Sequence, residues 1–297
     1  MEQVGRRTYT LPLRGKECVL GERTLLMGVL NATPDSFSDG GRFATTDAAI
    51  AHGLALFEAG ADLVDVGGES TRPGSTAVSP EEEIRRVAPV IEGLRKRGAS
   101  YLSVDTSKAA VAEAALDSGA DLVNDVSGFR FDPDLAPLIA ARGVPAVAMH
   151  LRGSFATMHE RPSYGDVMGE VTAELRESLA LAASAGLARE RIILDPGIGF
   201  AKDASHSLAV LSRLPELRAL DRPLLVGPSR KSFLGTVTGL PAGERLFGTA
   251  AAVAASVLGG AHLVRVHDVA EMVQVVKVCD ALLAATPAAE PAMAGRP

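Results

Sequence analysis

The sequence has few cysteines, and it lacks both long apolar runs and an excess of positive charge. Its two cysteines among 297 residues, Cys18 and Cys279, lie near opposite ends of the chain without the spacing of a metal site. We expect them to be free thiols in a reducing compartment. No apolar run reaches the length of a membrane span, and the N-terminal segment lacks the apolar region of a signal peptide. These absences favour a soluble, cytoplasmic protein.

The charge balance is mildly acidic, with 30 Lys and Arg against 36 Asp and Glu and a net charge of −6. This balance argues against non-specific binding to nucleic acid or to anionic membranes. It leaves room for an anionic substrate, which needs only local positive charge. We also find no Ser–His–Asp arrangement in the sequence, and neither cysteine lies near the end of an expected strand, so a nucleophile–base pair is not predicted.

Apolar runs alternate with helical segments along the chain, in which 47% of the residues are hydrophobic. Each run is nearly continuous, as is typical of parallel strands covered on both faces. Eight runs of this kind cover residues 25–31, 61–68, 100–107, 120–128, 144–150, 191–197, 222–229 and 261–268. Among the segments between them, residues 79–98 open with Ser, Pro and three Glu, which favours the start of a helix.

The number and spacing of these units indicate the fold. Eight strand–helix units within residues 25–285 match the size of a (β/α)8 barrel, so we predict an α/β protein with a TIM-barrel fold. A doubly wound open sheet is the alternative. Residues 1–24 predict a short hairpin, with its turn at Arg14 and Gly15, that closes the bottom of the barrel. Residues 286–297 are rich in Ala and Pro, and we expect a disordered tail there.

Polar side chains follow the apolar runs at the point where each expected strand ends. They include Asn31, residues 69–72, Asp105, Asn124, Asp125, His150, Asp195, residues 229–231, Arg265 and His267. In a (β/α)8 barrel the carboxyl ends of all strands meet at one mouth, where active sites are built. The sequence therefore predicts one shared polar site.

Each of these residues also has a simpler interpretation. Asp105 alone is more often a helix cap, Asn124 a turn residue, and Asp125 a cap or loop anchor. For His150 we favour a buried histidine with satisfied hydrogen bonds. However, Asp105, Asn124 and Asp195 all lie in or at the end of buried runs, where polar groups need partners. A heteroaromatic ring that presents several N–H donors would satisfy these three together.

Positive charge gathers at the ends of the later strands. Arg230 and Lys231 are adjacent, and Arg265 and His267 occupy alternate positions of one strand, which points both side chains the same way. Arg72 follows an earlier strand. In an acidic protein this grouping predicts an anion at the mouth, with phosphate or diphosphate as the first choice.

The stretch NATPDSFSDGG, residues 31–41, follows the first barrel strand. Asn31 can offer an amide oxygen to Mg²⁺ that accompanies a diphosphate, and Asp35 and Asp39 are further oxygen candidates. Phe37 could cover a pocket and exclude water, as residues of mobile lids do. A plain turn containing Asp and Gly is the alternative.

Taken together, the motifs resemble those of dihydropteroate synthases of the folate pathway. They are MGVLNATPDSFSDGG, DVGGESTRPG, SVDTSK, NDVSG, MHLRGS, LDPGIGF, GPSRKSFLG and RVHDV, in the order expected for that family. The resemblance implies the condensation of 6-hydroxymethyl-7,8-dihydropterin diphosphate with 4-aminobenzoate, which releases diphosphate. It also implies inhibition by sulfonamides, which mimic 4-aminobenzoate. Two positions depart from the family pattern: Ala32, and Ala201 where a glycine is expected.

The resemblance further implies roles for individual residues. The pterin ring would be held by Asp105, Asn124, Asp195 and Lys231, with Met149 packed against it. Arg265 and His267 would bind the diphosphate, and these two with Lys231, Asp105 and Asp195 form the expected catalytic set. The aminobenzoate side would be shaped by Phe37, Thr71, Arg72, Pro73, Phe200 and Ser232. Asn31 would bind Mg²⁺, and Asp39 would assist it.

Three other functions remain open from the sequence. A pterin-binding methyltransferase domain would share the pterin contacts but needs no diphosphate site. A barrel that has lost activity would lack residues such as Asn31, Lys231 or Arg265, all of which are present. An unrelated barrel enzyme would use the strand-end residues only as caps.

The family resemblance also implies a homodimer, for which the apolar segments 243–260 and 269–285 could form the interface.

Overall fold

The computed structural model describes residues 6–33, 42–70, 77–154, 157 and 163–285, without the side chains of residues 42–45. Eight parallel strands form one sheet in the order β8-β7-β6-β5-β4-β3-β10-β9. They are β3 Leu25–Asn31, β4 Leu63–Gly67, β5 Tyr101–Asp105, β6 Leu122–Asp125, β7 Ala146–Met149, β8 Ile192–Asp195, β9 Leu225–Val226 and β10 Leu263–Val266. A parallel bridge between Leu194 and Leu224 joins the two outer strands, β8 and β9. The predicted barrel is therefore confirmed, with each strand inside the run that predicted it.

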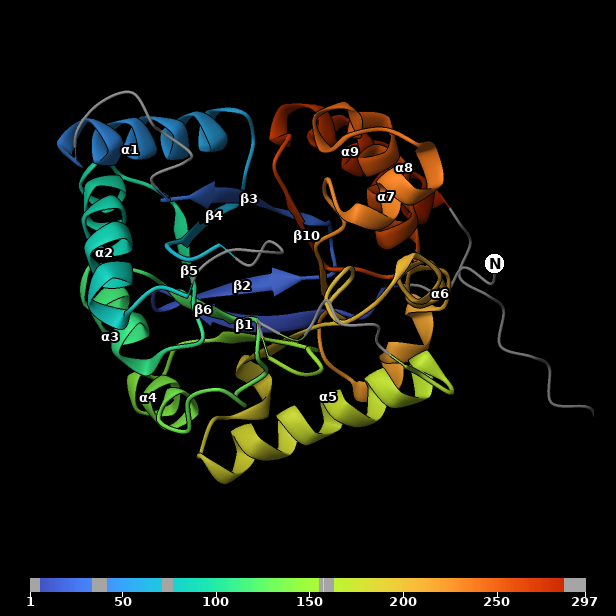
Figure 1. Ribbon diagram of the computed structural model, residues 1–297, viewed down its shortest axis with the longest axis horizontal. Helices are drawn as coiled ribbons and strands as arrows, with labels where there is room; N and C mark the ends of the chain where they lie inside the picture. Colours follow the sequence, from blue (N-terminus) through green and yellow to red (C-terminus); the bar gives the residue numbers. More distant parts are fainter. Residues whose placement is uncertain (1–5, 34–41, 71–76, 155–156, 158–162, 286–297) are drawn as a thin grey trace, which may run out of the picture.

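Helices surround the strands on the outside (Figure 1). They are α1 Arg42–Glu58, α2 Pro80–Lys96, α3 Ala109–Asp117, α4 Leu135–Arg142, α5 Val167–Ser184, α6 Ala204–Ser212, α7 Ser232–Thr238, α8 Leu246–Leu258 and α9 Val269–Ala285, with short 3-10 helices at Arg189–Arg191, Leu214–Leu220 and Ala242–Glu244. The helix predicted from residues 79–98 begins as expected, because Ser79 Oγ accepts the Glu82 N–H at 3.3 Å.

None of the helices in the described residues combines the length and the apolar character of a membrane span.

The alternation of side chains along each strand separates two apolar layers. Residues such as Leu26 and Val64 point outward and pack against the helices. The inward residues at the beginnings of the strands form a second buried cluster: Leu25, Met27, Leu63, Leu122, Val147, Ile193, Leu225 and Leu263. Because side chains alternate with a period of two, the next inward positions toward the carboxyl ends are fixed by this pattern.

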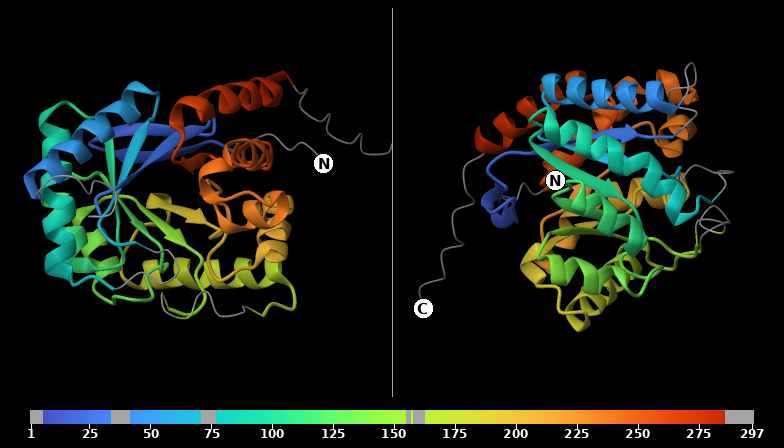
Figure 2. Two further views of the ribbon diagram at one scale, coloured as in Figure 1. Left: turned by 45° about the horizontal axis from the view of Figure 1, so that its top comes forward. Right: turned by 90° about the vertical axis from the view of Figure 1, so that its left-hand side faces the viewer.

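A two-stranded antiparallel hairpin, β1 Tyr9–Leu13 and β2 Lys16–Leu20, precedes the barrel, as predicted. Its turn residues Arg14 and Gly15 both have positive φ, 51° and 69°, as a type I′ turn requires. The hairpin residues Leu11, Leu13 and Leu20 belong to the inward cluster at the beginnings of the strands. The hairpin therefore covers the amino-terminal end of the barrel and leaves the carboxyl end for the site; Figure 2 shows it from two further directions.

Candidate active site

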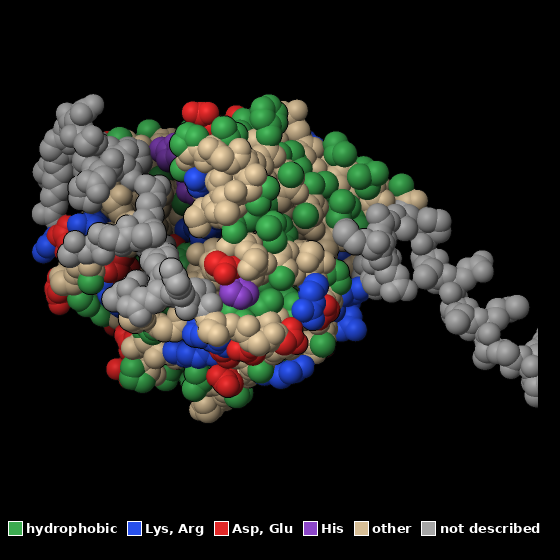
Figure 3. Space-filling view, turned by 45° about the vertical axis from the view of Figure 1, so that its right-hand side comes forward, with side chains coloured by type: hydrophobic (Ala, Val, Ile, Leu, Met, Phe, Trp, Pro, Cys, Tyr) green, Lys and Arg blue, Asp and Glu red, His purple; other side chains and the backbone are tan. Residues whose placement is uncertain are grey.

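Six of the site residues predicted from the sequence lie on the inner face of the barrel. Each follows an inward apolar or aromatic residue of its own strand by two or four positions. The pairs are Met27 and Asn31, Tyr101 and Asp105, Leu122 and Asn124, Val147 and Met149, Ile193 and Asp195, and Leu263 and Arg265. The structure thus brings together at the carboxyl ends of the strands residues that are up to 234 positions apart (265 − 31). Figure 3 shows Lys or Arg and His side chains in the recess beside the grey segments.

Arg265 is the centre of a charged network in this site. Its Nε donates to Asp65 Oδ2 at 2.6 Å, and one terminal nitrogen donates to Asp105 Oδ2 at 2.8 Å. Asn124 Nδ2 donates to the same Asp65 oxygen at 2.8 Å. Charge-assisted hydrogen bonds of this kind fix the orientation of a guanidinium. The network therefore holds one cation and two acids in a set geometry.

Asp65 is a site residue that we did not predict from the sequence. It is fully buried, and its Oδ1 has no hydrogen-bond partner among the residues that the structure describes. The signal was present, since Asp65 is the one charged residue inside the apolar stretch LVDVG of β4. A buried carboxylate in such a strand needs a positive partner, which Arg265 supplies from β10.

Burial moves the pKa values of three ionisable groups in the site toward 7. Burial raises the pKa of Asp105 to about 7, against the opposing charge of Arg265. Burial likewise raises the pKa of Asp195 to about 6, although its Oδ1 accepts the Gly197 N–H at 2.7 Å. Burial and the charge of Arg265 lower the pKa of Lys231 to about 7. A ligand that donates N–H groups to the two carboxylates would favour their ionised forms.

Lys231 and Phe200 meet at one side of the mouth. Lys231 Nζ lies 3.6 Å from the centroid of the Phe200 ring, a cation–π contact. Met149 packs in a small cluster with Ala201, and Phe200 lies against this cluster. Ser232, the first residue of α7, is exposed beside Lys231. An aromatic ring, an apolar surface and a cation are therefore placed around one space.

Two of the basic residues predicted at the ends of the last strands, His267 and Arg230, do not supply positive charge to the site. His267 Nδ1 lies 3.0 Å from Ser229 Oγ, and burial and the charge of Arg265 lower its pKa to about 4, so it is neutral near pH 7. Arg230, by contrast, pairs with Asp268 and is exposed. Among the described residues, Arg265 and Lys231 therefore supply positive charge inside the site, and Arg230 does not.

A protein-family model described as "Pterin binding enzyme" matches residues 27–267 of the chain. The chain belongs to this pterin-binding enzyme family. A dihydropteroate synthase of Synechocystis is 48% identical over 263 residues, which cover 88% of this chain and 91% of the relative. The solved structure of Xanthomonas albilineans dihydropteroate synthase with 4-aminobenzoic acid has a TM-score of 0.88 and 45% identity, and covers 95% of this chain and 100% of that one. The Yersinia pestis dihydropteroate synthase in a sulfonamide drug complex has a TM-score of 0.87 and 40% identity, with 93% and 100% coverage.

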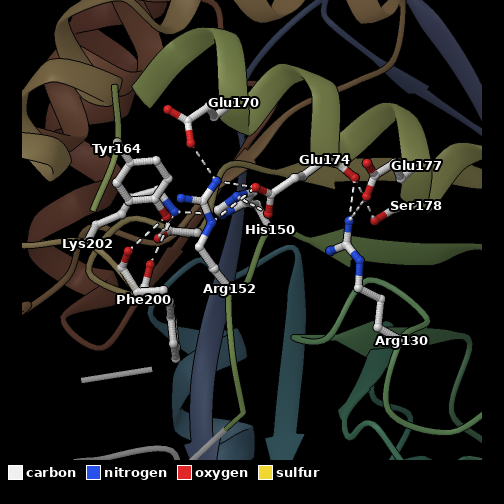
Figure 4. Close-up of polar contacts among 12 residues, drawn as sticks. Arg130, His150, Arg152, Tyr164, Glu170, Glu174, Glu177, Ser178, Phe200 and Lys202 are labelled. Atoms are coloured by element: carbon white, nitrogen blue, oxygen red, sulfur yellow. Dashed lines mark hydrogen bonds and ion pairs between the residues drawn. The ribbon is translucent and has the colours of Figure 1, made fainter. Parts of the chain in front are cut away.

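In this pterin-binding enzyme the other polar residues have structural contacts. Asp125 anchors the loop after β6, because its carboxylate accepts the Ser127 N–H at 2.8 Å and the Ser127 hydroxyl at 3.0 Å. His150 is fully buried; its Nδ1 lies 2.8 Å from Lys202 Nζ and its Nε2 lies 3.1 Å from Glu174 Oε2 (Figure 4). Six predicted residues lie outside the described part of the chain: Asp35, Phe37, Asp39, Thr71, Arg72 and Pro73.

The expected metal ligand Asn31 is the last residue of β3 and is half-buried at the mouth of the barrel. Within the part of the chain that the structure describes, no three His, Cys, Asp or Glu residues are grouped as metal ligands. The amide oxygen of Asn31 fits Mg²⁺, which commonly takes one or two protein oxygens, several waters and the phosphate oxygens of a substrate.

Proposed function

We propose that this protein is a dihydropteroate synthase, which joins 6-hydroxymethyl-7,8-dihydropterin diphosphate to 4-aminobenzoate and releases diphosphate. The observation that carries the proposal is the network of Arg265, Asp65 and Asp105, with Lys231 and Asp195 at the same mouth. It combines acceptors for the N–H groups of a pterin with positive charge for a diphosphate. The similar proteins with that name support the same reaction.

We propose a role for each group from its position in the site. Asp195 and Asn124 supply acceptors inside the barrel for the ring N–H groups, and Asp105 adds a third. Arg265 and neutral His267 bind the diphosphate, where the guanidinium supplies charge and the imidazole a hydrogen bond. Phe200 and Ser232 lie beside Lys231, where the aromatic ring of aminobenzoate would be placed.

The chemical step follows from this placement. The bond between the methylene carbon and the diphosphate oxygen breaks, and its electron pair leaves with the diphosphate. The amine of 4-aminobenzoate forms the new carbon–nitrogen bond and then loses a proton to solvent. The site binds both reactants in one orientation and stabilises the charge that develops on the leaving group, so it needs no nucleophilic side chain.

Mg²⁺ is the proposed cofactor, with Asn31 as a ligand from the described residues. When bound with the substrate, Mg²⁺ would neutralise part of the charge of the diphosphate. We also propose inhibition by sulfonamides, a cytoplasmic location and a homodimer. Cys18 and Cys279 are free thiols, which fits a reducing compartment.

The test is an assay of diphosphate release by the purified protein with Mg²⁺ and the pterin diphosphate, with and without 4-aminobenzoate. Release that requires the aminobenzoate, and that a sulfonamide inhibits competitively against it, is the expected result. Pterin binding without diphosphate release would instead favour a pterin-binding methyltransferase domain and contradict the proposal.

A further inference from the structure

The loop after β8 contains a buried lysine that the reaction above does not use. Lys202 is 7% exposed, and its Nζ lies 2.8 Å from His150 Nδ1. The same ammonium donates to the carbonyl oxygens of Gly197 at 3.1 Å and Phe200 at 3.2 Å. All three hydrogens of the ammonium therefore have an acceptor inside the protein.

The backbone of this loop has an unusual shape. Gly197, Gly199 and Ala201 all have positive φ, at 67°, 77° and 45°. A Cβ atom on Gly197 would lie 2.1 Å from the carbonyl oxygen of His150, so glycine is required there. At Ala201 the left-handed conformation costs about 1–2 kcal/mol. Such a backbone persists only where its surroundings hold it in place, and Lys202 binds two of its carbonyls.

The lysine is in turn fixed by contacts to α5. His150 Nε2 lies 3.1 Å from Glu174 Oε2, and Glu174 also accepts from Arg152 Nε at 3.1 Å (Figure 4). Burial and the charge of Lys202 lower the pKa of His150 to about 4, so the ring is neutral near pH 7. His150 Nδ1 then accepts from Lys202 and Nε2–H faces Glu174. This chain of contacts connects the loop to the end of β7 and to the long helix α5.

The two residues whose carbonyls bind Lys202 also contact the site. The Gly197 N–H donates to Asp195 Oδ1 at 2.7 Å, and the Phe200 ring lies 3.6 Å from Lys231 Nζ. Burial lowers the pKa of Lys202 to about 7, and the attraction of Asp195 opposes this change. A change in the lysine would therefore reach the pterin side of the site, while Arg265 and His267 lie on and just after a different strand, β10.

We propose that Lys202 is a positioning residue for the pterin ring, because its buried ammonium holds residues 197–201 in the shape in which the Gly197 N–H orients Asp195. The proposal rests on the proposed function for the identity of the ring. It predicts that the loss of the ammonium weakens binding of the pterin but leaves binding of diphosphate unchanged.

The variant Lys202→Met removes the ammonium and keeps most of the side-chain length. We would measure the affinity for 6-hydroxymethylpterin from the fluorescence of the pterin, since the chain has no tryptophan that would interfere. The affinity for inorganic diphosphate with Mg²⁺ would be measured by calorimetry. We expect the affinity for the pterin to fall at least tenfold and the KM for the pterin diphosphate to rise at least tenfold. The affinity for diphosphate should stay within twofold of wild type.

The matched control is Lys277→Met, at an exposed lysine of α9, which should leave both affinities unchanged. If Lys202→Met does not fold, Tyr164→Phe tests the same loop, because the Tyr164 hydroxyl donates to the Ala201 carbonyl at 2.8 Å. We expect a smaller loss of pterin affinity there, of about threefold. Wild-type pterin affinity in whichever variant folds, or an equal loss of pterin and diphosphate affinity, overturns the proposal. These are binding measurements, so they decide it even if the wild-type protein shows no turnover.

Discussion

At the scale of single residues, the buried carboxylate of Asp65 orients Arg265 and Asn124. It is fully buried and accepts hydrogen bonds from Arg265 and Asn124 through one oxygen, while the other oxygen has no partner in the described part of the chain. Removing the carboxylate from this ion pair would leave the guanidinium of Arg265 without its buried counter-charge. Arg265 would then be free to turn away from the diphosphate position.

Asp65→Asn should therefore lower kcat/KM for the pterin diphosphate. Hydrogen bonds to charged groups contribute about 1.5–3 kcal/mol, which corresponds to a decrease of roughly 10- to 100-fold. Steady-state kinetics would measure it. Asp62→Asn is the matched control, because Asp62 accepts the Leu26 N–H at the other end of the barrel, and its kcat/KM should stay within twofold. Equal kinetics for the two variants would remove Asp65 from the site.

Asp195 gives a prediction about pH. Burial raises its pKa to about 6 from an ordinary value of 3.8, so between about pH 4 and pH 6 the native state holds a proton that the unfolded state has lost. The free energy of unfolding therefore falls as pH rises through this window, and the full cost is present above pH 6. Asparagine carries no charge, so Asp195→Asn should gain stability relative to wild type between pH 4.5 and pH 8. Two pKa units set an upper bound of about 3 kcal/mol.

Urea unfolding at the two pH values measures this change. Asp203→Asn is a useful comparison, because backbone hydrogen bonding at the start of α6 lowers the pKa of that exposed acid. Because the carboxyl of Asp203 is ionised in both the native and the unfolded state throughout this range, the stability of Asp203→Asn relative to wild type should be the same at pH 4.5 and pH 8. A stability difference for Asp195→Asn that is the same at pH 4.5 and pH 8 would show that burial does not raise its pKa.

How far the sequence predicts the site also depends on the residue. Asp105, Asn124, Asp195 and Arg265 were predictable because strand alternation and the convergence of strand ends place them without knowledge of their partners. Asp65 was missed because its partner Arg265 is 200 positions away, and no local pattern shows such a pair. Lys202 was missed for a related reason: its contacts come from backbone carbonyls of a loop whose shape only the structure shows.

At the scale of elements, local patterns predicted the strands and the hairpin well. Continuous apolar runs mark buried parallel strands. The sequence GADLV occurs twice, at residues 60–64 and 119–123, each time between a helix and the next strand. In both copies the aspartate, Asp62 or Asp121, accepts a backbone N–H of the preceding strand at 2.8 Å. Strand β9 is shorter than its run, with only two residues, Leu225–Val226. Pro223 and Pro228 flank it, and proline has no N–H to donate to a neighbouring strand.

The hairpin should stabilise the barrel without affecting catalysis. Leu20 has no exposed surface and belongs to the inward cluster at the beginnings of the strands, whereas the neighbouring Val19 is 42% exposed. Leu20→Ala should therefore lower the free energy of unfolding by about 2–5 kcal/mol, and Val19→Ala by less than about 0.5 kcal/mol. Urea unfolding measures both. The KM values of folded Leu20→Ala should match wild type, and equal stability of the two variants would show that the hairpin does not form part of the core.

At the scale of the whole molecule, one face has more exposed apolar surface than the others described. Val237 on α7, Leu240 after it, Phe247 on α8 and Val278 on α9 are 62%, 41%, 87% and 61% exposed. Figure 3 shows hydrophobic side chains gathered over this part of the molecule. Contiguous patches of this kind commonly mark protein–protein contacts, and a second copy of the chain is the partner that the proposed homodimer supplies.

Phe247→Glu should convert the proposed homodimer to a monomer. Phe247 is the most exposed large hydrophobic residue described, and a two-fold interface contains each substituted position twice, so two carboxylates would be buried or brought close together. Sedimentation velocity at one protein concentration would measure the mass of wild type and variant. Leu181→Glu is the control, because Leu181 on α5 is 42% exposed and lies on a different helix, so this variant should remain a dimer. A monomeric wild type, or a Phe247→Glu variant that is still dimeric, would show that α7, α8 and α9 do not form the interface.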